Sequence, residues 1–207
     1  MNAKLLNGTI ALPDPLVKLG HRPGDPPHCS FYGMETAESR DIIQYMPISK
    51  EYAMEYGDLK GLIDGIHGEL GDSQGLIEVG TGKTAKGRDY IFSIIKTLLS
   101  PEKRGGVTYT LCLDADYPDF CMRMMGFFNE KGATGRRDAL CMELERRKNE
   151  GESTEDLLKR WMKDPYDENY TKGIRMNLSE QREYDESFPE HPLSVGRMIV
   201  DYYINNN

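Results

Sequence analysis

The sequence lacks the features that would cross-link the chain through disulfides or a metal, or anchor it in a membrane. Its four cysteines form no closely spaced pair, and no cysteine–histidine cluster has the spacing of a zinc site. Scattered, unpaired cysteines are typical of a reducing compartment, so we expect a cytoplasmic protein without a metal site. The N-terminal region has no apolar run of signal-peptide length. No stretch approaches the ~18 apolar residues of a membrane-spanning helix, so no membrane association is expected.

A surplus of basic residues is also missing, since the net charge is -8. Proteins that bind nucleic acid usually carry a basic surface that neutralises phosphates, so the composition disfavours nucleic acid as a partner. Hydrophobic residues make up only 38% of the chain, and part of it is therefore expected to lie outside the main core. A chain of 207 residues nevertheless buries roughly 70% of its unfolded surface, enough for a core without disulfides.

Proline and glycine divide the chain into three parts. Residues 1–27 contain five prolines, which fix φ and lack an N–H donor, so an irregular N-terminal arm is predicted. Residues 28–150 alternate between strand-like and helix-like patterns and are predicted to form an α+β sandwich domain. Residues 151–207 are predicted to form a helical C-terminal extension that packs on this domain.

The pattern of residues 28–150 predicts an antiparallel sheet of about five to six strands flanked by helices. The candidate strands are 28–34, 41–48, 76–79, 89–97, 106–113 and 120–128. The best alternation lies in 107–113, where apolar and polar residues exchange with period two. Residues 58–70 show the apolar stripe of an amphipathic helix, with Asp58 as its N-cap.

Two further helix patterns have clear starts. Residues 134–148 begin at a candidate N-cap, Thr134, and the predicted inner face consists of Ala139, Met142 and Leu144, with Cys141 as a further candidate. In the C-terminal extension, Ser153 and Asp156 form a variant of the capping box before another helix. Pro192 fits the first turn of the last helix.

Glycine-rich sequence after residues 76–79 offers a possible phosphate site. Gly80-Thr81-Gly82-Lys83-Thr84 places glycines and a lysine where a phosphate-cradling loop would need them. The pattern fails because Ile77 stands where its first glycine should be, and because the following residues favour a strand rather than a helix. We therefore interpret Gly80 and Gly82 as part of a turn between antiparallel strands.

A second possible anion site lies at the start of the 134–148 helix. Arg136 and Arg137 follow Gly135, and free N–H groups at a helix start attract anions. Asp138 is a competing partner for either arginine, so the same residues also fit a purely structural helix entry. If Lys83 and Arg136 met at one anion, a small nucleotide- or phosphate-using enzyme would be indicated.

No other residues form a catalytic or metal-binding pattern. The four histidines are isolated in sequence, and the acidic residues 114, 116 and 119 lack the glycine and terminal glutamate of a calcium loop. No catalytic residue and no cofactor is therefore predicted. The aromatic residues Trp161, Tyr166 and Tyr170 are candidate partner-binding residues, for another protein or for self-association, although a tail that wraps its own domain is the favoured interpretation.

The order of predicted elements resembles the Mog1/PsbP-like α/β/α sandwich. Two strands (28–48), a helix (58–70), a meander (76–128) and a packing helix (134–148) follow one another as in that family. Known members bind partners, one a small GTPase and another the oxygen-evolving complex of photosystem II. The resemblance therefore implies a non-enzymatic binding role, and a non-catalytic binding or accessory protein is our leading hypothesis.

Overall fold

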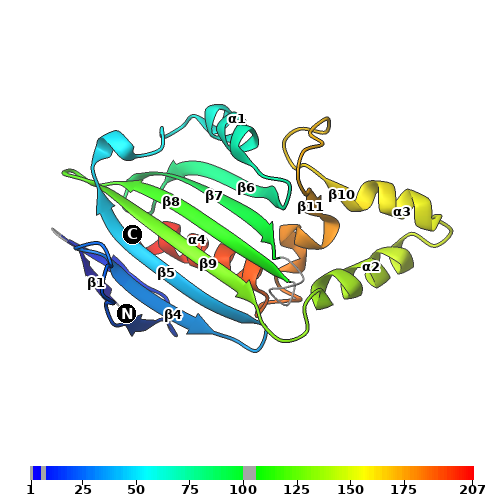
Figure 1. Cartoon of the computed structure of the whole chain (residues 1–207), viewed down its shortest axis with the longest axis horizontal. Helices are drawn as coiled ribbons and strands as arrows, with labels where there is room; N and C mark the ends of the chain where they lie inside the picture. Colours follow the sequence, from blue (N-terminus) through cyan, green and yellow to red (C-terminus); the bar gives the residue numbers. More distant parts are fainter. Residues whose placement is uncertain (1, 6–7, 100–105) are drawn as a thin grey trace.

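A computed structural model describes residues 2–5, 8–99 and 106–207 of the chain. Its centre is a seven-stranded antiparallel sheet with the order β3-β4-β5-β9-β8-β7-β6 (Figure 1). The strands are β3 (Val17–Leu19), β4 (Ser30–Glu35), β5 (Ser39–Ile48), β6 (Gln74–Lys83), β7 (Asp89–Leu98), β8 (Val107–Asp116) and β9 (Cys121–Glu130). The predicted α+β class is confirmed, with more strands than the five to six expected.

The long C-terminal helix α4 (Pro192–Asn206) covers one face of this sheet. Its residues Leu193, Ile199 and Tyr203 are buried in the same core as the inward side chains of β5, β8 and β9. Pro192 stands in the first helical turn, as predicted, where its missing N–H costs nothing. Helix α4 lies in the predicted extension, so the last residues of the chain complete the core of the sheet.

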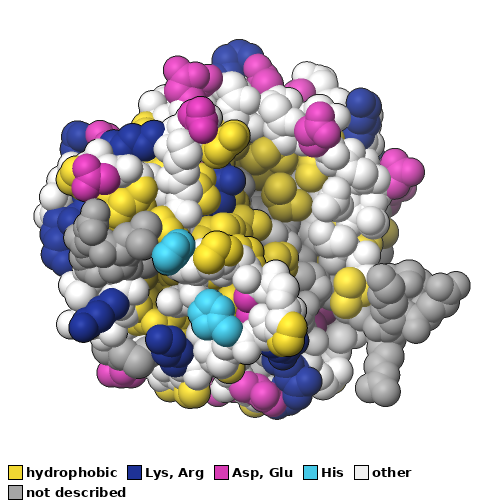
Figure 2. Space-filling model, turned by 60° about the vertical axis from the view of Figure 1, so that its left-hand side comes forward, with side chains coloured by type: hydrophobic (Ala, Val, Ile, Leu, Met, Phe, Trp, Pro, Cys, Tyr) yellow, Lys and Arg dark blue, Asp and Glu magenta, His cyan; other side chains and the backbone are white. Residues whose placement is uncertain are grey.

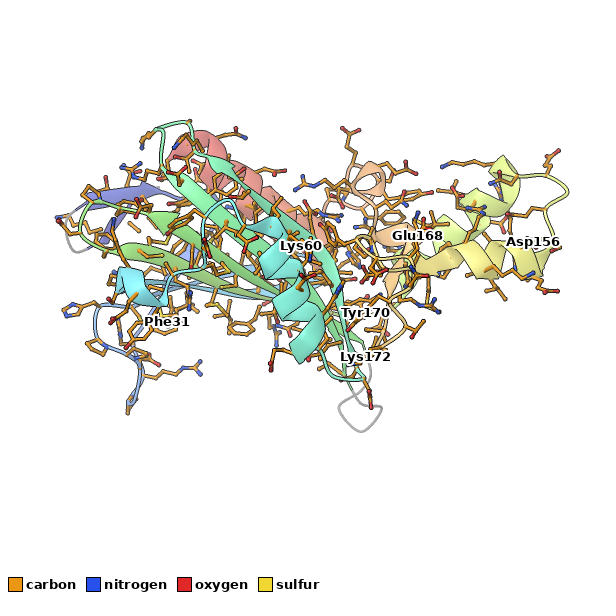
Figure 3. All side chains as sticks on the ribbon, turned by 90° about the horizontal axis from the view of Figure 1, so that it is seen from above. Phe31, Lys60, Asp156, Glu168, Tyr170 and Lys172 are labelled. Atoms are coloured by element: carbon orange, nitrogen blue, oxygen red, sulfur yellow. The ribbon has the colours of Figure 1, made fainter. Side chains whose placement is uncertain are left out.

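The second face of the sheet is less covered. Hydrophobic side chains gather in a hollow of the molecular surface (Figure 2). Seen from above, helix α1 (Leu59–Glu69), which carries Lys60, lies on the side of the sheet opposite α4 (Figure 3). Asp58 caps α1 as predicted, because its carboxylate accepts a hydrogen bond from the Gly61 N–H at 2.8 Å. No residue of α1 is buried.

Gly80 and Gly82 lie inside β6, so the prediction that they form the turn is wrong. The strands β6 and β7 are antiparallel as expected, but the chain reverses at residues 84–88, where Thr84 N–H bonds to the carbonyl of Arg88 at 2.8 Å. Phe92 and Tyr90 lie directly opposite the two glycines. A Cβ at Gly80 would fall 2.4 Å from the Phe92 ring, so the glycines make room for aromatic rings within the strand.

The N-terminal segment is more regular than its prolines predicted. Among residues 2–5 and 8–27, the structure has a hairpin of β1 (Asn2–Leu5) and β2 (Gly8–Ala11), and β3 joins the edge of the main sheet. Ile10, Leu12 and Leu16 are buried in the main core. The prolines lie between these strands rather than within them, so they interrupt the ladder without preventing it.

The segment after β9 builds a smaller second core. It contains α2 (Arg136–Lys148), α3 (Thr154–Trp161), the strand pair β10 (Met162–Lys163) and β11 (Met176–Asn177), and the short helices η3 (Leu178–Glu180) and η4 (Arg182–Tyr184). Ser153 caps α3 by accepting from the Asp156 N–H, as predicted. Within the part of the chain that the structure describes, no helix has the length and hydropathy needed to cross a membrane.

Asp41 on β5 gives the fold a testable dependence on pH. Its side chain is only 2% exposed, and Oδ2 has no hydrogen-bond partner. Burial raises the pKa of this carboxyl to about 7, although the Ser39 hydroxyl opposes the shift. The folded protein therefore favours the neutral acid. This stabilisation is complete below about pH 4 and is lost as the pH rises to 7.

We expect Asp41→Asn to stabilise the protein at pH 8 but not at pH 4. The full pKa shift of Asp41 corresponds to a change in the free energy of unfolding of at most about 4 kcal/mol. Urea unfolding of both proteins at pH 4, 6 and 8 measures the difference, with the exposed Asp72→Asn as the control. A stability difference that is the same at all three pH values would contradict the assignment.

Candidate functional site

Helix α2 is rotated away from the predicted orientation. It buries Arg137, Cys141 and Glu145 and leaves Leu140 and Leu144 exposed by 45% and 42%. The predicted inner face of Ala139, Met142 and Leu144 is therefore wrong for Ala139 and Leu144, which are exposed, whereas Met142 packs against the second core. Cys141, the further candidate, is fully buried as expected.

Buried polar contacts explain this orientation. The Arg137 guanidinium donates to the Ser179 carbonyl at 2.6 Å, to Ser194 Oγ at 2.8 Å and to Asp185 at 3.0 Å. One residue of η3, one that directly follows η4 and one of α4 thus hold a single side chain. Removing either member of such a buried pair leaves an uncompensated charge, so the interaction fixes the rotation of α2.

A second buried charge fixes the other end of α2. Glu145 accepts hydrogen bonds from the Tyr184 hydroxyl at 2.7 Å, from Arg160 at 2.8 Å and from Lys148 at 2.9 Å. The bond from Tyr184, together with those from Arg160 and Lys148, lowers the pKa of Glu145 to about 2. The carboxylate therefore stays charged and binds α2 to α3 and η4.

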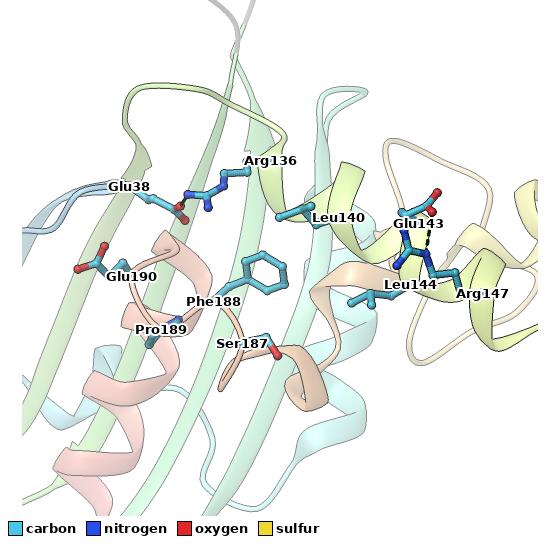
Figure 4. Close-up of a pocket in the computed structure, with 10 residues that line it drawn as sticks. All are labelled: Glu38, Arg136, Leu140, Glu143, Leu144, Arg147, Ser187, Phe188, Pro189 and Glu190. Atoms are coloured by element: carbon cyan, nitrogen blue, oxygen red, sulfur yellow. Dashed lines mark hydrogen bonds and ion pairs between the residues drawn. The ribbon is translucent and has the colours of Figure 1, made fainter.

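The outer face of α2 forms a groove with residues 187–190, which we call the α2 groove (Figure 4). Its floor consists of Leu140, Leu144, Phe188 and Pro189, and its volume is about 500 Å³. Ion pairs lie along it: Arg136 binds Glu38 at 2.5 Å, and Arg147 binds Glu143 at 2.8 Å. The α2 groove is therefore an apolar surface with a charged rim.

The two cations of the predicted anion site do not meet. Lys83 lies at the end of β6 and binds Asp89 at 2.7 Å, beside a turn whose Ala85 N–H bonds to the last turn of α4. Arg136 lines the α2 groove beside Glu190, just before the first turn of α4. Because α4 has 15 residues, its ends lie about 22 Å apart, too far for one phosphate to bridge.

Arg137 lies beside a small polar cavity of about 200 Å³ that the sequence did not predict. Lys96 donates to Glu180 at 2.7 Å, and Tyr109 donates to the same carboxylate at 2.8 Å. His191 lies 3.7 Å from Glu130. These side chains come from five different elements, namely β7, β8, β9, η3 and the start of α4, so no local motif could have revealed them, and they bind one another rather than pointing free into the cavity.

The predicted partner-binding aromatics contact the protein's own chain. Trp161 is buried in the second core, and the Tyr166 hydroxyl accepts from the Val79 N–H at 2.7 Å. Tyr170 stacks on His67 with ring centroids 4.0 Å apart and donates to the His67 carbonyl at 3.1 Å. These contacts correspond to the alternative in which the C-terminal segment wraps its own domain.

The described residues contain no evident metal-binding site. Nowhere in residues 2–5, 8–99 and 106–207 do three or more histidine, cysteine or acidic side chains gather in a way that could hold an ion. His67 binds Asp164 at 3.0 Å, which gives that histidine a structural partner.

We expect substitutions of Arg137 and Arg136 to differ sharply in their effect on stability, although the two residues are neighbours in the sequence. Arg137→Leu leaves the partly buried Asp185 with one partner fewer and frees the Ser179 carbonyl, so unfolding should become easier by about 3 kcal/mol. Arg136→Leu removes only an exposed pair with Glu38 and should cost less than about 1 kcal/mol. Denaturant unfolding measures both, and equal effects would contradict the buried network.

Comparison with known proteins gives no further guidance on the site. No protein-family model matches the chain, and no curated protein matches it.

Proposed function

We propose that this protein is a non-catalytic binding protein, and that its α2 groove holds an amphipathic helix of another protein. One observation carries the proposal: α2 buries charged side chains and exposes its leucines. Scattered apolar residues on a surface need no explanation, but adjacent leucines that floor a groove of about 500 Å³ do.

The shape of the α2 groove supports a helical ligand. Its residues on α2 run from Arg136 to Arg147 along one side of the helix, a length of about 16 Å, or three helical turns. Helices that dock in grooves place apolar anchors at spacings of three and four residues. Phe188 and the two leucines supply the apolar floor, and the ion pairs supply the polar rim that is typical of protein interfaces.

Charge disfavours a second copy of this chain as the occupant. In an antiparallel pair of α2 helices centred on Leu140 and Leu144, Arg136 of one copy would approach Arg147 of the other, because both arginines line the groove. Like charges placed opposite each other weaken an interface. A different protein, whose helix offers leucine-like anchors flanked by basic residues, fits this face better, because the lining contains three glutamates and two arginines.

Several features favour a cytoplasmic protein that does not bind nucleic acid. All four cysteines are free, as expected in a reducing compartment. The net charge of -8 opposes binding to phosphates. The resemblance of the element order to the Mog1/PsbP-like sandwich also favours a partner-binding role.

Replacing Leu140 or Leu144 by aspartate should abolish partner binding without unfolding the protein. A partner protein is first captured from the native host. Its binding helix is then synthesised as a peptide for affinity measurements. We expect each substitution to weaken binding at least tenfold, about 1.4 kcal/mol, because it places a charge on the apolar floor. The free energy of unfolding should change by less than about 0.5 kcal/mol, because both leucines face solvent.

The matched control is Leu158→Asp, a somewhat more exposed leucine on α3 that does not line the α2 groove. Equal loss of affinity in this control would refute the assignment of the groove. Circular dichroism of the bound peptide provides a second test, since a segment that stays non-helical would also refute it.

A further inference from the structure

The face of the sheet opposite α4 carries two neighbouring rows of uncharged residues across six strands. The first row runs from β4 to β6 through Gly33, Ile42, Phe127, Thr110, Ile95 and Leu76. The second runs through Phe31, Gln44, Met125, Cys112, Ser93 and Val79. Paired residues in an antiparallel sheet point to the same side, so these rows form one continuous surface, which we call the apolar band.

Charged residues border the apolar band on both sides. Beyond the second row, Asp114 pairs with Arg123 at 2.7 Å. Beyond the first row, Arg40 lies opposite Asn129. Neighbouring strands lie about 4.8 Å apart, so six strands give the band a length of about 24 Å.

The apolar band is uncovered on β5, β8 and β9, whereas Leu76, Val79 and Ser93 at its β6 end are buried. Ile42 and Phe127, near its middle, are exposed by 41% and 39%, and Phe31, Met125 and Cys112 are partly exposed. Figure 2 shows hydrophobic side chains gathered in a hollow of the molecular surface. An uncovered apolar surface of this extent is rare on a monomer unless it binds something.

Helix α1 turns one end of the apolar band into a cavity. Leu62, Gly65 and Ile66 of α1 and Ile95 of β7 line a space of about 520 Å³, within the range of small-molecule sites. A Cβ built on Gly65 meets no atom within 4 Å, so the space beside the helix is empty. Glu69 is the single charged residue in the lining of this cavity.

We propose that the apolar band and the cavity beneath α1 bind an elongated, uncharged aliphatic molecule, independently of the α2 groove. Apart from Glu69, the lining is uncharged, so a long hydrocarbon chain matches it and a phosphate or nucleotide does not. The cavity is concave, as small-molecule sites are. A second copy fits poorly, because a two-fold dimer would place two hollows against each other and leave the space between them unfilled.

The test fills the cavity with a side chain. Gly65→Leu adds a leucine where the structure leaves space, and the same helix offers a matched control, Gly68→Leu, which also meets nothing within 4 Å but does not line the cavity. Both changes remove a helix-weakening glycine equally, so neither should unfold the protein. The probe is N-phenyl-1-naphthylamine, an uncharged apolar fluorophore, displaced by 1-tetradecanol.

We expect saturable binding of the fluorophore to the wild type, displacement by tetradecanol, and at least a tenfold loss of affinity in Gly65→Leu. Gly68→Leu should stay within twofold of the wild type. A second variant, Phe127→Lys, places a charge in the middle of the apolar band and should also lose binding, whereas Leu158→Lys on α3 should not.

Three results would overturn the proposal. One is the absence of saturable binding to the wild type, and another is equal affinity in the Gly65 and Gly68 variants. The third is sedimentation that shows a dimer broken by Phe127→Lys, because a second copy would then occupy the band. Variants of Leu140 and Leu144 should bind the fluorophore normally, so failure of the α2 groove leaves this test intact.

Discussion

The structure depends on a simple constraint: a seven-stranded sheet has two faces, and within the described part of the chain only one long helix packs across it. Helix α4 buries the side chains of one face together with Ile10 and Leu12 from the N-terminal hairpin. On the other face, α1 is short and contacts mainly the β6 edge, and none of its residues is buried. The exposure of Ile42 and Phe127 follows from this unequal covering rather than from any local irregularity of the strands.

A second constraint acts on α2, where buried charge decides which side faces solvent. Arg137 and Glu145 lie on the same side of the helix and both find several partners on η3, η4 and α3. Turning Leu140 and Leu144 inward would require these charges to leave their partners, at a cost that the burial of leucines does not offset. The exposed apolar floor of the α2 groove is therefore a consequence of the polar network behind it.

The sequence predicted most strands and helices but neither candidate binding surface. Period-two alternation located β8, and capping residues located α1 and α3, because these signals are local. Gly80 and Gly82 were misassigned because their partners, Phe92 and Tyr90, lie on the next strand. The sequence did not predict the orientation of α2, because the hydrophobicity of Leu144 is the same whichever side of the helix faces the core. What decides it is Arg137, whose partners lie more than 40 residues away.

The two surfaces differ in how much they must change on binding. The α2 groove rests on a helix held at both ends by hydrogen bonds of its buried side chains Arg137 and Glu145, so its apolar floor is already in place and a ligand helix loses little affinity to reorganisation. Helix α1 has no buried residue, and its first-turn cap, Asp58, belongs to an exposed loop. Elements with few buried contacts open and close at low free energy. A molecule on the apolar band would complete the burial of Leu62 and Ile66, which are partly buried, so it would gain apolar contacts that the unliganded protein lacks.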